Sequence, residues 1–473
     1  MTLSVFPSAE RIATGTPAGR DRAIDVARII SLVVVMFGHC AFVLATTTPS
    51  GLMVGNLLAA APTIQPLTWV LQIMPLFFLA GAASAAYGLD RAASHDDDDR
   101  QPWGVWLLTR TQRLARPVFW YLGAWTLVLI ATQLFAGPTA ASRLGAQVVA
   151  LLWFIGVYLV ILAFVPALVR LTSRRTFGLL VVGLLAATAV CDAARIHFDS
   201  MAFGLPNFLN VWLIPAAIGV AYARRLITPA AALLIGAGAL VLNVLLVAVG
   251  PYEMSLVVTG DERLSNVTPP TLLLGLHCVW MSLLFVALAR RIGEWAQRPR
   301  VWRWVAIGNG GAMTLYLWHI PALVAAILIC HAAGLDAYDP AQPFFWPLLM
   351  LRAAVFTVAM SVLFVALTPA EHRALPWWDA AIIATGARST AMGILVCTAG
   401  VSILLMAKQG LGTTTGWWAL AGFLVALGAA RALSGAKASS SDSLEMQLVP
   451  TIREYEEPLA RESSAESLTV PAR

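Results

Sequence analysis

The sequence predicts an all-α, polytopic transmembrane helical bundle, and three observations support this prediction. Of the 473 residues, 59% are hydrophobic and only 12% are charged, whereas a soluble domain has about 25% charged residues. The apolar residues gather in runs long enough to cross a bilayer, which takes a helix of about 20 residues. Arginines gather in the polar segments on one side of these runs. We therefore expect this chain to lie in a lipid bilayer and to bind no nucleic acid.

The apolar runs divide the chain into an arm, a membrane region and a tail. We expect residues 1–25 to form a cytoplasmic arm and residues 434–473 a disordered cytoplasmic tail, since the tail is polar and has no apolar periodicity. The run at 177–191 is short, and the stretch 377–386 is typical of an interfacial helix. The expected spans are 26–45, 67–89, 118–136, 146–169, 177–191, 208–223, 230–250, 272–289, 312–333, 345–367, 391–407 and 416–433.

The distribution of charge predicts the orientation of the spans, because short loops rich in Lys and Arg stay cytoplasmic. With the N-terminus inside, every inner segment holds more of these residues than any outer segment. We therefore expect both termini in the cytoplasm and a multi-pass protein in the inner (plasma) membrane of a bacterium. The Arg- and Ala-rich composition fits a GC-rich bacterial genome.

The first span contains two polar residues that a lipid-facing helix would not favour. The stretch RAIDVARIISLVVVMFGHC places Arg28 eleven positions before His39, which puts both side chains on one helix face about 16 Å apart. Arg28 alone would fit an interfacial residue paired with Asp25, one turn before it. His39 lies deeper, and charged or titratable groups at that depth usually face a cavity with a function.

An arginine cluster precedes the third span. In WLLTRTQRLARPVFWYL the residues Arg110, Arg113 and Arg116 recur every three positions, so they follow one flank of a helix up to Pro117. One interpretation is topology anchoring with contacts to lipid phosphates. The other is a clamp for a phosphorylated ligand, because guanidinium groups bind phosphate through paired hydrogen bonds.

The ninth span contains a second histidine inside the membrane. In GNGGAMTLYLWHIPAL, Tyr316 and His319 lie one turn apart on one face. The first and ninth spans both run from inside to outside, so His39 and His319 are predicted to line one cavity. Histidine is the side chain whose pKa suits proton transfer at neutral pH.

Metal and disulfide sites are not predicted. The five cysteines are scattered and form no C-x-x-C pair, so we interpret them as small buried residues. The acidic run in HDDDDR, at 95–100, is interpreted as a solvated loop, because consecutive side chains point in different directions. We expect no permanently bound cofactor.

Five segments resemble, in order and topology, the bacterial acyltransferase-3 family of integral membrane O-acyltransferases. They are spread over residues 22–370. Ala80 and Ala312 stand where the family often has serine, with Thr314 near the second position, so a hydroxyl role at those two sites is in question. The matching segments are DRAIDVARIISLVVVMFGHC, QIMPLFFLAGAASA, RTQRLARPVFWY, LLWFIGVYLVILAFVPAL and GNGGAMTLYLWHIPAL.

The resemblance implies a fold, an activity and a set of site residues. It implies a core of about ten helices at 26–370. The interfacial segment and two additional spans expected at 371–433 lie outside the resemblance. The implied reaction moves an acyl group, usually acetyl from acetyl-CoA, to a hydroxyl of an envelope glycan or glycolipid, trehalose mycolates among them. The implied catalytic residues are Arg28, His39, Tyr316 and His319, and the implied coenzyme A ligands are Arg110, Arg113 and Arg116.

Two questions stay open at the level of sequence. His39 could deprotonate the acceptor hydroxyl or accept the acyl group transiently. A transporter or lipid flippase is a competing class, since polar groups within the membrane also mark substrate pathways. An acyltransferase consumes the thioester when its acceptor is present, and a transporter does not. A scaffold whose tail recruits partners would leave the histidines without a role.

Overall fold

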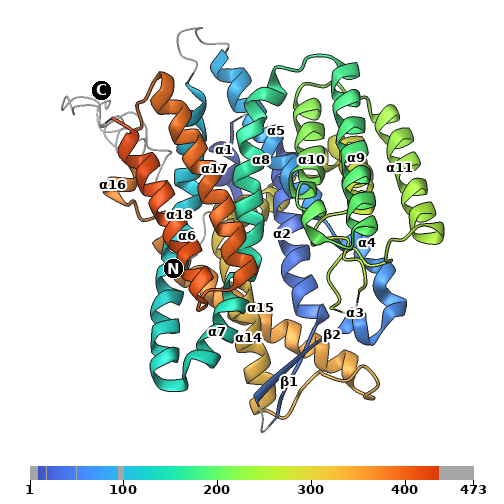
Figure 1. The fold of residues 1–473 in the computed structure, drawn as a ribbon, viewed down its shortest axis with the longest axis vertical. Coiled ribbons are helices and arrows are strands. Elements are labelled where there is room, and N and C mark those ends of the chain that lie inside the picture. The colour runs from blue at the N-terminus through green and yellow to red at the C-terminus, as the bar shows by residue number, and fades with distance from the viewer. Residues whose placement is uncertain (1–8, 18, 49–50, 94–100, 261, 436–473) are drawn as a thin grey trace, which may run out of the picture.

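The computed structural model describes residues 9–17, 19–48, 51–93, 101–260 and 262–435. Among these residues, twelve helices are long and apolar enough to cross a membrane, which confirms the predicted helical bundle. Most of the expected tail, residues 436–473, and the acidic run lie outside the described residues. The elements (Figure 1) are α1 (Ala9–Thr14), α2 (Arg22–Phe42), β1 (Val43–Thr48), β2 (Gly51–Asn56), α3 (Leu57–Ala60), η1 (Pro62–Leu67), α4 (Thr68–Leu71), α5 (Met74–Ala93), α6 (Trp103–Ala136), α7 (Pro138–Val149), η3 (Ala150–Leu152), α8 (Trp153–Val169), α9 (Arg174–His197), η4 (Met201–Gly204), α10 (Asn207–Ala223), α11 (Pro229–Val249), α12 (Leu272–Trp295), α13 (Pro299–Gly310), α14 (Ala312–Ala332), α15 (Phe345–His372), α16 (Pro376–Asp379), α17 (Gly386–Gln409) and α18 (Thr414–Leu433).

The helix α2 lies in the middle of the bundle and positions the candidate site. It contacts α5, α12, α13, α14 and α15. Its N-terminus is capped by Asp21, whose carboxylate accepts hydrogen bonds from the backbone of Ala23 and Ile24. The same carboxylate accepts hydrogen bonds from Tyr87 (2.9 Å) and Tyr222 (2.8 Å), on α5 and α10. These contacts fix where α2 begins relative to two neighbouring helices.

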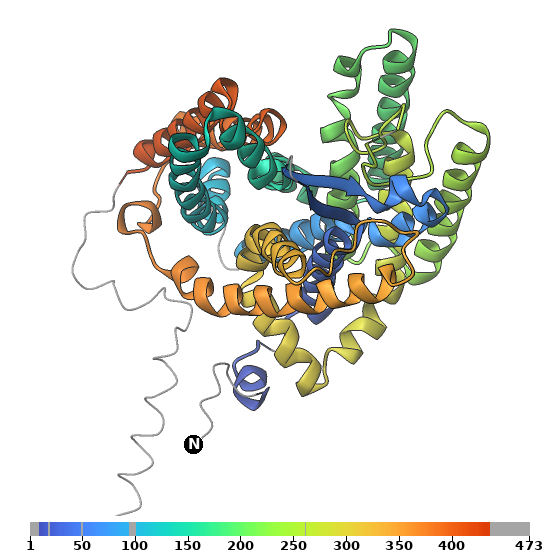
Figure 2. The same ribbon diagram turned by 90° about the horizontal axis from the view of Figure 1, so that it is seen from below.

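A β-hairpin, which is absent from the predicted all-helical bundle, follows α2. The expected span 26–45 ends as a helix at Phe42, and β1 then pairs antiparallel with β2 from Val43↔Asn56 to Thr48↔Gly51. The Thr-rich end of this segment favours strand over helix, because β-branched residues lose side-chain freedom in a helix. Figure 2 shows the hairpin lying across the end of the bundle at which α2 ends.

Two helices are longer than their apolar runs predicted. The short run 177–191 lies within α9, which has 24 residues. The arginine cluster and the third span form one helix, α6, of 34 residues that continues through Pro117. A proline inside a membrane helix is tolerated when neighbouring groups satisfy the backbone carbonyl that it frees. The expected interfacial helix at 377–386 is limited to α16, of four residues.

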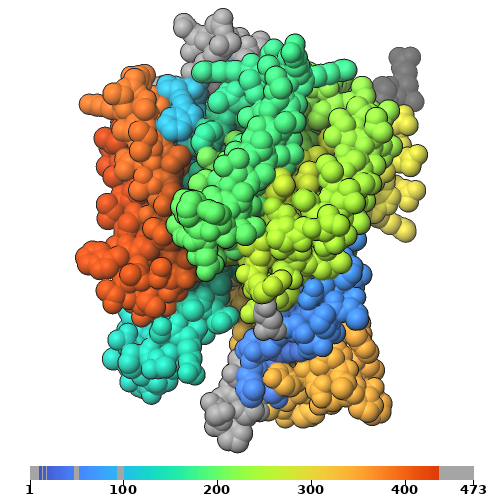
Figure 3. Space-filling view, turned by 45° about the vertical axis from the view of Figure 1, so that its right-hand side comes forward, coloured from blue at the N-terminus to red at the C-terminus, as the bar shows by residue number. Residues whose placement is uncertain are grey.

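The two C-terminal helices are built into the bundle. The helix α17 packs against α6, α8 and α18, and Figure 3 shows α17 and α18 in orange and red along one side of the molecule. A Cβ at Gly156 of α8 would lie 2.5 Å from the carbonyl oxygen of Gly400 in α17. Small residues of this kind let membrane helices approach closely. Figure 3 also shows α9 and α11 side by side on this face.

Candidate active site

The helices α2 and α14 bring the two predicted histidines into contact. Nε2 of His319 lies 3.2 Å from Nδ1 of His39, and the ring centroids are 5.2 Å apart. His319 is fully buried and His39 is half-buried. The prediction that these side chains share one location rested on span orientation alone, and the structure places them within hydrogen-bond distance.

The hydrogen bonds assign the protons on both rings. Nδ1 of His319 lies 2.7 Å from the carbonyl oxygen of Tyr316, and a carbonyl oxygen can only accept, so Nδ1 of His319 holds a hydrogen. In a neutral ring Nε2 of His319 is then an acceptor, and Nδ1 of His39 is the donor to it. His39 also hydrogen-bonds to the backbone of Val35, one turn earlier. With Nδ1 of His39 as the donor, Nε2 of the neutral ring holds no hydrogen, and its lone pair can act as a base or a nucleophile.

Tyr316 contributes to the pair through its backbone. Its carbonyl oxygen orients His319, whereas its hydroxyl donates a hydrogen bond to the carbonyl of Leu151. The ring packs edge-on against Phe154 with centroids 5.6 Å apart. The centroids of the Tyr316 and His319 rings are 6.3 Å apart. The phenol thus packs between α14 and α8, and the carbonyl is the group of Tyr316 that contacts His319.

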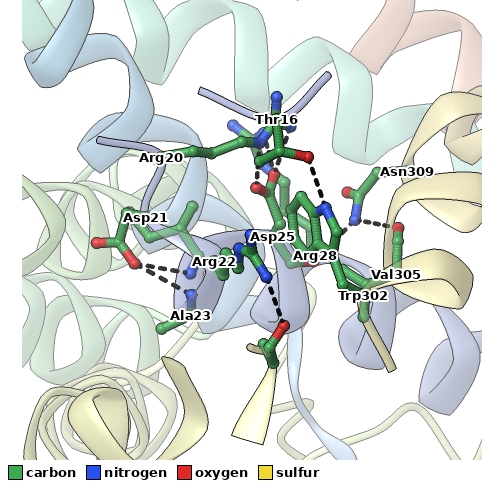
Figure 4. A network of polar contacts seen from close by, with 12 residues as sticks. Thr16, Arg20, Asp21, Arg22, Ala23, Asp25, Arg28, Trp302, Val305 and Asn309 are labelled. Atoms are coloured by element: carbon green, nitrogen blue, oxygen red, sulfur yellow. Dashed lines mark hydrogen bonds and ion pairs between the residues drawn. The ribbon is translucent and has the colours of Figure 1, made fainter. Parts of the chain in front are cut away.

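Arg28 lies at the other end of α2, within a network of charges (Figure 4). Its guanidinium is 3.8 Å from the Asp25 carboxylate and donates a 3.4 Å hydrogen bond to the carbonyl of Ala80 on α5. Asp25 is bound more closely by Arg20, at 2.7 and 3.1 Å, and this contact raises the pKa of Arg20. Asn309 donates to the Asp25 carbonyl at 2.9 Å. Arg20 is therefore the closer partner of Asp25, and Arg28 contacts this carboxylate only at 3.8 Å.

The three arginines of α6 have different surroundings. Arg110 is half-buried over the Trp106 ring, 4.7 Å from its centroid, and lies within electrostatic range of Arg28. Arg113 is exposed. Arg116 forms a 2.5 Å ion pair with Asp379 of α16. The structure therefore places Arg110 toward Arg28, leaves Arg113 accessible and binds Arg116 to a residue outside the expected core.

One buried charge next to the histidine pair was missed by the sequence analysis. Arg352 of α15 is 2% exposed and donates a 2.6 Å hydrogen bond to the carbonyl of Cys40, the residue that follows His39. Within the described part of the chain, its Nε and one terminal nitrogen are buried with no hydrogen-bond partner. An arginine in the middle of the apolar run 345–367 was the signal that could have identified it, because charges at that depth are costly.

The bundle, the paired histidines and the basic groups along α2 and α6 define an integral membrane protein with a buried polar site. Residues 21–368 match the model of the acyltransferase-3 family, described as an acyltransferase domain. The chain therefore belongs to this family of membrane acyltransferases, as the sequence resemblance predicted. The match includes every residue of the candidate site and ends before α16. No curated protein and no solved structure matches the chain.

Proposed function

We propose that this membrane acyltransferase moves an acetyl group from acetyl-CoA, bound on the cytoplasmic side, to a hydroxyl of a cell-envelope glycan or glycolipid. The observation that supports this proposal is the contact between His39 and His319 within the span of α2. Transfer to a hydroxyl requires a group that removes its proton or accepts the acyl group first. The unprotonated Nε2 of His39 is suited to either task.

In the direct route, His39 acts as a general base. Nε2 of His39 takes the proton of the acceptor hydroxyl while the hydroxyl oxygen attacks the thioester carbonyl. The C–S bond breaks, and the coenzyme A thiolate takes the proton back from His39. During this step His39 is an imidazolium, and its Nδ1–H donates to His319, whose orientation the Tyr316 carbonyl fixes. The arrangement resembles the way a third group orients the base in a catalytic triad.

In the stepwise route, His39 is the nucleophile. Nε2 attacks the thioester carbonyl, the C–S bond breaks, and an acyl-imidazolium forms as the thiolate leaves. The acceptor hydroxyl then attacks this acyl group, its proton passes to the thiolate, and neutral His39 is restored. Both routes place the reacting carbonyl at His39, so both fail without this side chain. Acyl label trapped on His39 in the absence of acceptor would favour the stepwise route.

The basic residues at the Arg28 end of α2 are proposed to bind the coenzyme A portion. Arg28 and Arg110 lie within electrostatic range of each other, and Arg113 is exposed. Guanidinium groups suit the phosphates of coenzyme A. With both termini in the cytoplasm of a bacterium, this end faces the pool of acyl-CoA, and the histidine end lies nearer the outer leaflet. A trehalose mycolate-type lipid is one acceptor of the proposed class.

Transfer of labelled acetyl tests the proposal. Purified protein in lipid nanodiscs is incubated with radiolabelled acetyl-CoA and an extract of envelope glycans and lipids, as wild type, His39→Gln and His197→Gln. His197 is an exposed histidine at the end of α9, so its variant is the matched control. We expect label on an acceptor and free coenzyme A with wild type and the control, and neither with His39→Gln. Full transfer by His39→Gln would contradict both routes, and lipid movement without thioester consumption would indicate a flippase.

A further inference from the structure

A cavity lies on the opposite side of α2 from the histidine pair. It has a volume of about 770 Å³ and is bounded by α2, the end of α12, α13, α14 and α15. This is within the range of about 300–1,000 Å³ that small-molecule sites occupy. Its walls are mostly apolar, and we call it the α2–α15 groove. Representative lining residues are Ile30, Val33, Phe37, Trp304, Phe356 and Met360.

The helix geometry separates this groove from the candidate active site. Ile30 follows Arg28 by two positions and Phe37 precedes His39 by two positions. Two positions on an α-helix correspond to a rotation of about 200°, so the groove-lining side chains of α2 point away from the face of Arg28 and His39. A molecule in the groove would therefore contact α2 without reaching the reacting atoms.

The groove is open along its length to the hydrocarbon of the bilayer. Ile30, Val33 and Phe37 are 42%, 41% and 38% exposed although they line it. An edge-on contact between Phe37 and Phe356, with ring centroids 5.6 Å apart, lies along its wall. An apolar surface of this kind does not by itself select a ligand in a membrane, because lipid chains are as apolar as leucine. Selection has to come from polar groups at an end of the groove.

One end of the groove is basic and aromatic. Arg300, at the start of α13, lines it and is exposed. Glu294 is the single acidic residue in the sequence from 290 to 303, and it faces Arg290 at 3.8 Å. Trp295 and Trp304 also line the groove and are 43% and 62% exposed. Tryptophan gathers at the level of lipid headgroups, so this end lies where a lipid phosphate would be.

We propose that the α2–α15 groove is a binding site for an anionic phospholipid. One acyl chain lies against α2 and α15, and the headgroup phosphate lies at Arg300 between the two tryptophans. The charge of the rim supports this occupant, because basic pockets between membrane helices bind anionic headgroups, each Arg or Lys strengthening the attraction. The bound lipid would hold α13 and α15 against the back of the helix that bears Arg28 and His39.

Competition between two lipids tests this proposal. The protein is delipidated in detergent, titrated with phosphatidylglycerol or phosphatidylcholine, and examined by native mass spectrometry as wild type, Arg300→Gln and Arg174→Gln. Arg174 is exposed at the start of α9 and is absent from the groove lining, so its variant makes the same change of charge elsewhere. We expect one tightly bound phosphatidylglycerol in wild type and Arg174→Gln, and binding weaker by about fivefold in Arg300→Gln, as loss of one arginine contact implies.

A second variant tests the groove itself. Val33→Trp places a large side chain in the groove and is expected to remove the bound lipid while the chain still elutes at the volume of the folded wild type. Equal retention of the two lipids, or identical binding by Arg300→Gln and Arg174→Gln, would overturn the proposal. So would a dimer that holds no lipid, because a second copy would then cover the groove. Since lipid binding is measured without acetyl-CoA, these results do not depend on the proposed acyl transfer.

Discussion

At the scale of single residues, the site depends on which nitrogen of each histidine holds a hydrogen. The Tyr316 carbonyl fixes the proton of His319, and His319 in turn fixes that of His39. Under the proposed function, the pair acts as a unit in which His39 performs the chemistry and His319 positions it. Residues that act as a unit show strongly non-additive effects when they are replaced.

This unit predicts the outcome of a double replacement. His39→Ala is expected to lower kcat by about 10²–10⁴-fold, the usual contribution of a positioned base. His319→Ala is expected to lower kcat less, because His39 keeps its Nε2 lone pair but loses its orientation. The double variant should be no slower than His39→Ala alone. Acetyl transfer measured for all four proteins checks this, and effects that multiply would show that the two histidines act independently.

Arg352 supports a second prediction at this scale. Its hydrogen bond satisfies the Cys40 carbonyl in the last turn of α2, next to His39. Arg352→Ala leaves this carbonyl unpaired, at a cost of about 1–3 kcal/mol in stability. We expect a lower melting temperature and a lower kcat, with KM for acetyl-CoA unchanged because the basic end of the site lies at the opposite end of α2. A raised KM with normal kcat would instead assign Arg352 to the donor.

At the scale of elements, α6 shows how far periodicity can predict a site. The spacing of Arg110, Arg113 and Arg116 correctly indicated a helix, and the structure gives the three arginines different surroundings. Arg116 is bound to Asp379, which lies 263 positions later in the chain. A local pattern contains no information about such a partner. The histidine pair could be predicted because span orientation is itself a property of the whole sequence.

The ion pair of Arg116 with Asp379 predicts that acetyl-CoA binding and the stability of the fold depend on different residues. Arg113→Gln is expected to raise KM for acetyl-CoA, because its exposed guanidinium is free to meet a phosphate. Asp379→Asn is expected to leave KM unchanged and to destabilise the fold by about 2 kcal/mol, the contribution of a hydrogen bond between charged groups. Thermal unfolding and initial rates of both variants check this. Loss of acetyl-CoA binding in Asp379→Asn would place Arg116 at the donor site.

At the scale of the whole molecule, the sequence predicted the spans and the family, and the packing order needed the structure. Apolar runs identify spans because each must cross the same thickness of hydrocarbon. They do not say which spans touch. The helix α17 lies against α6 and α8, far from it in sequence. The hairpin after α2 was missed because its first residues continue an apolar run, so a helix and a strand were equally compatible with the pattern.

The position of α17 predicts that the last two helices are required for a stable bundle. Gly104 of α6 donates its backbone N–H to Ser389 of α17 at 3.0 Å, and Gly156 of α8 meets Gly400. A chain that ends after Asp379 would expose these closely packed surfaces to lipid. Gly104 and Trp103 of α6 would then lose their contacts with α17. We expect a lower yield of monodisperse protein and a melting temperature several degrees lower, by size-exclusion chromatography and thermal unfolding.

Gly400→Leu in the full chain should reproduce part of this loss, since the larger side chain meets the α8 backbone. A truncated chain with an unchanged melting temperature would show instead that residues 21–368, which the family model matches, are stable without α17 and α18.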